Sequence, residues 1–254
     1  MMETVLDVQN IEKHYPGFTL ENVSFSLKSK RIMGLIGKNG AGKSTPLKAI
    51  LNMASPEKGS VTMFQKDFYR YEKECKQRIG VVFGGIDFYP LKKLSAITAV
   101  TRKFYEEWDQ TQYKKYIQRF ALDERKKFKE LSNGMKVKYL LALALSHHAE
   151  LLILDEPTSG LDPVSREELL HIFRQIVKSE NCSILFSTHI TSDLDRCADD
   201  ITYIQSGRVL QSADKNTFLS SFEHLRTPED AGPLTLEEIM LRTERSEWDE
   251  DAAV

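Results

Sequence analysis

A glycine-rich segment, GKNGAGKST at residues 37–45, could bind an anion and a metal ion. It follows an apolar run, Ile32–Ile36, and precedes a segment with helical character, which is the strand, loop and helix order of phosphate-binding loops. Glycines let the backbone curl until its N–H groups converge on an anion, and the following helix adds a partial positive charge. The segment therefore predicts a site for nucleotide phosphates.

The side chains of this segment have distinct expected roles. We expect Lys43 to place its ammonium on the β- and γ-phosphates, and the Ser44 hydroxyl to ligate Mg²⁺. A glycine-rich turn that binds no nucleotide is the alternative, and a second motif further along the chain argues against it. The predicted phosphate contacts are Gly37, Asn39, Gly40, Gly42, Lys43, Ser44 and Thr45.

The second motif is LLILDE at residues 151–156, four aliphatic residues followed by two carboxylates. A buried parallel strand carries the residues at its end to the carboxyl edge of its sheet, where ligands bind. Asp155 could then reach Mg²⁺ through water, and Glu156 could orient and deprotonate an attacking water. An ordinary solvated turn is the alternative. With the phosphate loop upstream, the motif predicts an ATP site.

Two further segments flank this strand: LSNGM at residues 131–135 and SGLD at residues 159–162. With them, the chain over roughly residues 4–220 resembles the ATP-binding subunits of ABC transporters, whose signature is ordinarily LSGGQ. The resemblance implies ATP and Mg²⁺ as ligands and ATP hydrolysis coupled to transport. It also implies a head-to-tail dimer with a second ATP-binding subunit, as a homodimer or a heterodimer. Ser132 and the amides around Gly134 would approach the γ-phosphate held by the other subunit.

The resemblance extends to three single residues. Asp162 belongs to the segment that resembles the loop crossing the dimer interface. His189 in STHI resembles the switch histidine that contacts the γ-phosphate, and Tyr15 matches the aromatic residue that stacks on adenine. Taken alone, a histidine at a strand end and a tyrosine before proline are more often structural, but their order and spacing favour the functional interpretation. The implied catalytic set is Lys43, Glu156 and His189.

The chain departs from the family pattern at two positions. After the strand Ile79–Phe83 the family usually carries a glutamine that touches Mg²⁺, and here Gly84 follows. Asp87 could replace that oxygen ligand or could be an exposed turn residue. Pro46 stands where an aliphatic residue is usual; a first helical turn tolerates proline, although proline disfavours helical geometry at Thr45. Catalysis or coupling is therefore expected to differ from the family norm.

Composition sets the broad class of the protein. At 254 residues and 41% hydrophobic, the chain can bury a core large enough for one domain with an inserted lobe. A net charge of −2 gives no general attraction for nucleic acid, and we expect no such partner. Three cysteines without a CxxC pair indicate a reducing, intracellular compartment. Because there is no 18-residue apolar run or signal-peptide core, we expect that the chain does not span a membrane by itself. The family resemblance then implies a peripheral protein at the cytoplasmic face of the membrane.

The pattern predicts an α/β fold of the P-loop NTPase, ABC-ATPase type. A mostly parallel core sheet is joined by an antiparallel β edge subdomain from Val5–Ile11 and Phe18–Leu27, with Tyr15 on the connecting loop. An α-helical lobe is inserted at about residues 86–147. Asp162 as cap and Pro163 in the first turn predict the start of a later helix. The helices expected in the lobe are Ser95–Phe104, Gln110–Phe120 and Gly134–Ser146.

The chain divides into an ATP-binding domain, residues 1–226, and an acidic C-terminal tail, residues 227–254. From Glu229 onward nine acidic side chains face two arginines, which leaves the preceding body near +5. A short helix is expected over Thr235–Arg242, and the last eight residues are expected to be disordered.

The expected function is an ATP-binding and ATP-hydrolysing subunit that dimerises around two ATP and drives a separate integral membrane permease. The LSNGMK signature resembles ATPases paired with the compact ABC-2-type permeases of bacterial exporters, so an exporter is favoured. Candidate residues for a permease groove are Phe88, Tyr89 and Leu91, with the alternative that these are only core residues. Two alternatives stay open: a soluble ABC ATPase of the iron-sulfur assembly type, and a nucleotide-binding module with little turnover.

Overall fold

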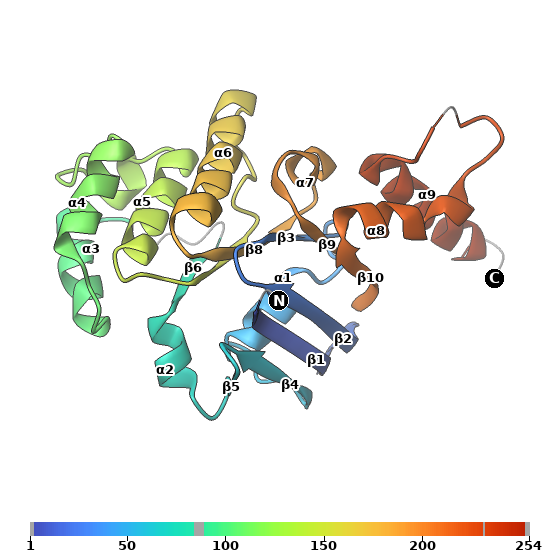
Figure 1. Ribbon diagram of the computed structural model, residues 1–254, viewed down its shortest axis with the longest axis horizontal. Coiled ribbons are helices and arrows are strands. Elements are labelled where there is room, and N and C mark those ends of the chain that lie inside the picture. The colour runs from blue at the N-terminus through green and yellow to red at the C-terminus, as the bar shows by residue number, and fades with distance from the viewer. Residues whose placement is uncertain (1–2, 84–88, 231, 252–254) are drawn as a thin grey trace.

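The computed structural model describes residues 3–83, 89–230 and 232–251, which form two sheets covered by helices (Figure 1). The larger sheet has the strand order β10-β9-β3-β8-β7-β6, and all its neighbouring pairs are parallel except β9 with β10. The prediction of a mostly parallel core sheet is confirmed. Its strands are β3 (Ile32–Ile36), β6 (Ile79–Phe83), β7 (Leu151–Asp155), β8 (Ser183–Thr188), β9 (Asp200–Gln205) and β10 (Arg208–Asp214).

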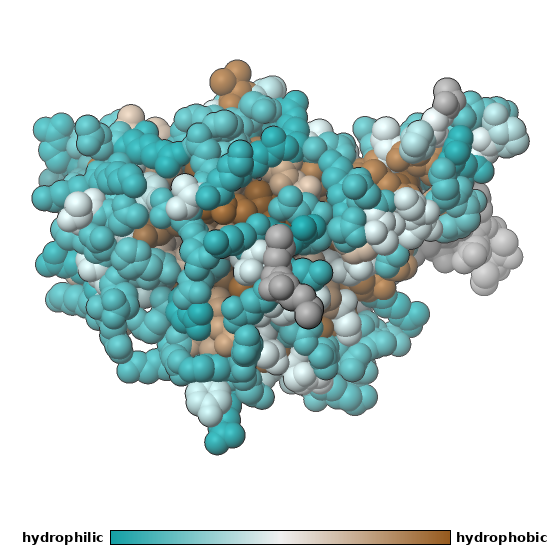
Figure 2. All heavy atoms as spheres, in the orientation of Figure 1, coloured by the Kyte–Doolittle hydropathy of each residue, from teal (hydrophilic) through white to brown (hydrophobic). Residues whose placement is uncertain are grey.

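The central strands form because most of their residues are apolar or β-branched. Every residue of β3 and β8 is buried, as expected for strands covered on both faces. Figure 2 shows a mostly hydrophilic face on which apolar side chains gather where the helices meet this sheet. Among the described residues, no helix has both the length and the apolar character needed to cross a bilayer.

The smaller sheet is the predicted antiparallel edge subdomain, in the order β2-β1-β4-β5. One detail of its prediction is wrong: Tyr15 is the last residue of β1 and pairs with Phe18, so it does not lie on the loop. The turn is tighter than expected because Gly17 adopts a positive φ of 79°. The strands are β1 (Thr4–Tyr15), β2 (Phe18–Lys28), β4 (Lys58–Met63) and β5 (Lys66–Asp67).

A lobe of helices lies at one end of the core sheet, beside β6 (Figure 1). Its apolar side chains are part of the main core, and three buried hydroxyls meet inside it: that of Thr98 lies 2.8 Å from the Tyr113 hydroxyl and 2.9 Å from that of Tyr139. The expectation of helices in this stretch is confirmed to within a few residues. They are α3 (Leu94–Thr101), η1 (Arg102–Phe104), α4 (Gln110–Arg119), η2 (Phe128–Glu130) and α5 (Asn133–Leu145).

Of the remaining helices, α1, α2, α6 and α7 lie between strands, and α8, η3 and α9 follow the last strand, β10. The predicted start of α6 is confirmed: the Asp162 carboxylate accepts hydrogen bonds from the N–H groups of Val164 and Ser165, and Pro163 is the first helical residue. These helices are α1 (Ser44–Ile50), α2 (Glu72–Gln77), α6 (Pro163–Ser179), α7 (Thr191–Cys197), α8 (Lys215–Ser221), η3 (Glu223–Leu225) and α9 (Leu236–Asp251).

The C-terminal helix α9 is longer than predicted. It passes Arg242 and continues to Asp251, so the expected disorder is wrong up to that residue. Thr235 and Glu238 form a reciprocal cap at its start, with N–H to side-chain distances of 2.7 Å and 3.2 Å. Ile239 is fully buried, because apolar residues on one side of the acidic helix pack against the core.

Candidate functional site

Three strands bring the metal-binding candidates together. Because β3, β8 and β7 are parallel neighbours, the residues at their carboxyl ends meet at one edge of the sheet. Ser44, at the start of α1, donates its hydroxyl to Asp155 Oδ1 at 3.0 Å. The Ser187 hydroxyl donates to the same oxygen at 2.6 Å. The structure thus places both predicted metal-ligating side chains in contact, and adds Ser187.

The three catalytic candidates also form a continuous row. Lys43 Nζ lies 3.2 Å from Glu156 Oε1, and His189 Nδ1 lies 2.8 Å from Glu156 Oε2. The Lys43 ammonium also donates to the carbonyl oxygens of Gly37 and Lys38, at 2.8 Å and 3.0 Å. Only 6% of Lys43 is exposed, so these oxygens take the place of water around its charge.

Ser187 fixes the backbone between the two acids. Its hydroxyl accepts from the Glu156 N–H at 2.9 Å while it donates to Asp155. Glu156 adopts a φ of 49°, a left-handed conformation that is unfavourable for a residue with a side chain. The hydrogen bond from the Glu156 N–H to the Ser187 hydroxyl helps to hold this conformation, in which the Glu156 carboxylate contacts Lys43 and His189. Sequence reasoning missed Ser187, because SILFST signals only a buried strand.

The phosphate loop has the backbone that its glycines were expected to allow. Gly40 and Gly42 have φ values of 85° and 100°. A Cβ on Gly42 would lie 2.3 Å from the Phe18 ring, and one on Gly37 would lie 2.3 Å from the Ile204 carbonyl oxygen. Side chains at these two positions would therefore force the loop to move.

The phosphate loop and the row formed by Lys43, Glu156 and His189 face one pocket of about 440 Å³. Phe18 is the aromatic residue on its wall, whereas Tyr15, the predicted adenine platform, is 38% exposed with its ring 6.4 Å from that of Phe18. Sequence reasoning missed Phe18; its place two residues after Pro16 in the same hairpin was the available signal. The residues on the pocket wall are Phe18, Asn39, Gly40, Gly42, Lys43, Ser44, Thr45, Glu156, Ser159 and His189.

The residues of the LSNGM signature and Asp162 lie at the starts of α5 and α6. Ser132 caps α5 and Asp162 caps α6, and a Cβ on Gly134 would lie 3.7 Å from the Leu161 side chain. Hydrogen bonds, chiefly from Ser165, hold the pKa of Asp162 below its ordinary value. The starts of the two helices therefore lie side by side. Ser132, Gly134 and Asp162 are not among the residues on the wall of the phosphate pocket.

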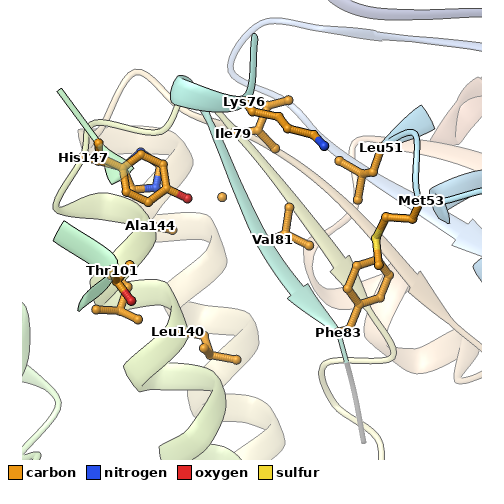
Figure 3. A pocket seen from close by; sticks show the side chains of 13 residues that line it. Leu51, Met53, Lys76, Ile79, Val81, Phe83, Thr101, Leu140, Ala144 and His147 are labelled. Atoms are coloured by element: carbon orange, nitrogen blue, oxygen red, sulfur yellow. The ribbon is translucent and has the colours of Figure 1, made fainter. Parts of the chain in front are cut away.

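A second cavity, of about 390 Å³, lies between β6 and the helical lobe (Figure 3). Val81 and Phe83 of β6 form one side and Leu140 of α5 the other. Beyond it, an adjoining apolar hollow is lined by Val100 and Phe104, which are 51% and 70% exposed. Tyr89 lines this hollow, and Leu91 is exposed close by in the chain, whereas Phe88 lies outside the described residues.

His147 closes one end of the second cavity. Its ring stacks on Tyr105 with 3.6 Å between centroids, and its Nδ1 lies 3.0 Å from the Gln77 carbonyl oxygen. Burial lowers the pKa of His147 to about 4, because the charged imidazolium would lose its hydration. The side chain is therefore neutral at pH 7 and donates its Nδ1 proton to Gln77.

Of the two positions that depart from the family pattern, the structure describes Pro46 but not Gly84. Pro46 lies in the first turn of α1, where its missing N–H would have no helical partner, as predicted. Gly84 and Asp87 lie outside the described residues.

The model of the family described as "ABC transporter" matches residues 20–159. The bacitracin transport ATP-binding protein BcrA of Bacillus licheniformis is 28% identical over 89% of this chain and 72% of its own length. The Nod factor export ATP-binding protein I of Burkholderia orbicola is 32% identical over 85% of this chain and 73% of its own length.

Solved structures share the fold. A structure described as the ATP binding subunit of an ABC transporter superposes with a TM-score of 0.81 at 24% identity, over 94% of this chain and 99% of that one. The predicted ABC-ATPase fold is thereby confirmed. The chain belongs to the ABC transporter family, as an ATP-binding subunit that hydrolyses ATP to drive transport.

Proposed function

We propose that Lys43, Glu156 and His189 carry out ATP hydrolysis, and that Ser44 and Asp155 hold Mg²⁺. The observation that supports this most strongly is the row of contacts through Glu156, with Lys43 on one carboxylate oxygen and His189 on the other. Phosphates would compete with Glu156 for the Lys43 ammonium. Glu156 would then be free to take the proton of a water that attacks the γ-phosphorus, while the bond from that phosphorus to ADP breaks.

The donor set beside this row suits Mg²⁺. Ser44 and Asp155 offer one hydroxyl and one carboxylate at hydrogen-bonding distance from each other, and Mg²⁺ sites with phosphates use few protein ligands. Within the described residues, His, Cys, Asp and Glu form no cluster of three that could hold a metal ion by itself. Bound there, the ion would offset the phosphate charge. Ser187 would keep Asp155 oriented toward it.

We infer that the ATP site is completed by a second subunit arranged head to tail. Ser132, Gly134 and Asp162 share one surface but do not line the pocket that holds Lys43. Because these residues do not line the phosphate pocket of their own chain, they would instead contact ATP bound to the phosphate loop of a second subunit. Differential affinity of ATP for the closed dimer would then couple binding to movement.

The second cavity and the adjoining apolar hollow together form the groove beside β6, which we propose as the docking site for a membrane permease. Its walls are mainly apolar, and two exposed aromatic residues, Tyr89 and Phe104, continue the apolar surface. Exposed apolar surface of this kind marks a protein interface. The chain would then act from the cytoplasmic face of the membrane as a peripheral subunit, without nucleic acid.

Export is the favoured direction of transport. Relatives are described by bacitracin transport, Nod factor export and linearmycin resistance, and we extend only the direction to this chain. A binding module with little turnover remains a second candidate, because Gly84 replaces the glutamine usual in the family.

Steady-state ATP hydrolysis by the purified subunit tests the assignment. Glu156→Gln is expected to lower turnover about 100-fold or more, since it removes the base. Glu57→Gln is the control, because Glu57 contacts His14 in the edge sheet, away from the pocket. Equal turnover in Glu156→Gln and the wild type would refute the role of Glu156, whereas wild-type ATP binding without hydrolysis would favour the second candidate.

A further inference from the structure

The C-terminal helix α9 reaches the phosphate loop through one buried acid. Glu244, only 7% exposed, places Oε2 2.6 Å from Nζ of Lys38, the residue that follows the first glycine of the loop. Its other oxygen, Oε1, accepts from the Tyr203 hydroxyl at 3.2 Å. A buried carboxylate is costly unless it is paired, so Glu244 depends on both contacts.

Other contacts anchor α9 and fix where Glu244 lies. Arg242 donates two hydrogen bonds to the Asp230 carboxylate, at 2.6 Å and 2.5 Å, and a third to the Leu225 carbonyl oxygen at 2.7 Å. Ile239 is fully buried one turn before them. Figure 1 shows α9 beside α8, at the end of the molecule away from the helical lobe. The helix therefore holds Glu244 in a defined position.

Lys38 connects this helix to the catalytic lysine. Its ammonium meets Glu244, while its carbonyl oxygen accepts from Lys43 Nζ at 3.0 Å. The hold of Glu244 on Lys38 thus favours the loop geometry in which Lys43 is bound to backbone carbonyls. ATP phosphates would compete for Lys43, and their charge would also attract Lys38 away from Glu244.

We propose that Glu244 is a positioning residue that lowers the ATP affinity of the phosphate loop by restraining Lys38. Glu244 of the tail and the phosphates of the nucleotide would compete for the Lys38 ammonium. By thermodynamic reciprocity, ATP binding loosens the docking of α9 to the same degree that docked α9 weakens ATP binding. The acidic tail is thereby a built-in regulator of the ATP site.

Calorimetric titration of the full chain with Mg²⁺ and the non-hydrolysed analogue AMP-PNP tests this proposal. Glu244→Gln keeps the shape of the side chain and an acceptor for Tyr203 but removes the charge. We expect it to lower the Kd about threefold to fivefold, more at low salt. In a Lys38→Met background the same substitution should change nothing further. Glu237→Gln is the matched control, because Glu237 is an exposed acid on the same helix.

A Kd that stays the same or rises in Glu244→Gln would overturn the proposal, as would a fall that persists with Lys38→Met. The inference rests on ATP binding at the phosphate loop, which the wild-type titration checks separately. Hydrogen exchange of the wild-type chain gives a readout that needs no variant. AMP-PNP should speed exchange of the α9 amides, and unchanged or slower exchange there would refute the coupling.

Discussion

At the scale of single residues, Ser187 links the two acids of the site. One hydroxyl donates to Asp155 and accepts from the Glu156 N–H, so it orients the proposed metal ligand and the proposed base together. Sequence reasoning could identify Asp155 and Glu156 because acids at the end of an apolar strand stand out. It could not identify Ser187, since its role depends on the pairing of β7 with β8.

Ser187→Ala is expected to lower kcat by about tenfold or more, because Glu156 loses a bond that holds its left-handed conformation. Steady-state hydrolysis measures this loss. Ser212→Ala, which removes a comparable hydroxyl contact with Thr202 at 2.8 Å, should leave kcat unchanged. Equal rates in both variants would show that Ser187 does not position the acids.

His147 makes stability depend on pH. Its pKa is about 4 in the folded chain and near 6.5 when unfolded, so as pH falls the unfolded chain binds the proton first. The folded state should therefore lose up to about 3 kcal/mol between pH 6.5 and pH 4. Urea unfolding at pH 7 and pH 5 measures the loss. His147→Gln should reduce it, and an identical pH dependence in both proteins would contradict the assignment.

At the scale of elements, the sequence predicted a strand or a helix start correctly where the local residues alone determine it. Apolar runs indicated β3 and β7, and Asp162 with Pro163 indicated the start of α6. Prediction failed where tertiary contacts decided the outcome. The last eight residues were expected to be disordered, yet α9, which docks on the core through its apolar residues and the Arg242–Asp230 pair, continues to Asp251. The pairing of Tyr15 with Phe18 was hidden for the same reason.

The helical lobe depends on its central hydroxyl network. Thr98→Val should lower the free energy of unfolding by about 1–3 kcal/mol, because the buried hydroxyls of Tyr113 and Tyr139 each lose a partner. Thr101→Val is the control, since among the described residues the Thr101 hydroxyl donates only to the Ile97 carbonyl oxygen of its own helix. Urea unfolding compares them, and equal losses would remove the network as the cause.

At the scale of the whole molecule, the two halves of the proposed ATP site lie on different parts of one chain. Lys43 and Glu156 face the phosphate pocket, while Ser132 and Asp162 cap the helices α5 and α6. A second copy, turned head to tail, would bring one half against the other twice, which is the closed symmetry of a two-fold dimer. The groove beside β6 would then pass the closing motion to a permease.

This claim of a shared site is tested most directly by the mass of the Glu156→Gln variant in solution, measured by light scattering with Mg-ATP. Because Glu156→Gln is expected to bind ATP without hydrolysing it, its mass should double when ATP is added. Lys43→Ala or Ser132→Arg in the same background should keep it monomeric, since each removes one half of the site. A monomer at saturating ATP in Glu156→Gln, or a dimer that forms equally well with Ser132→Arg, would show that two subunits do not share the ATP site.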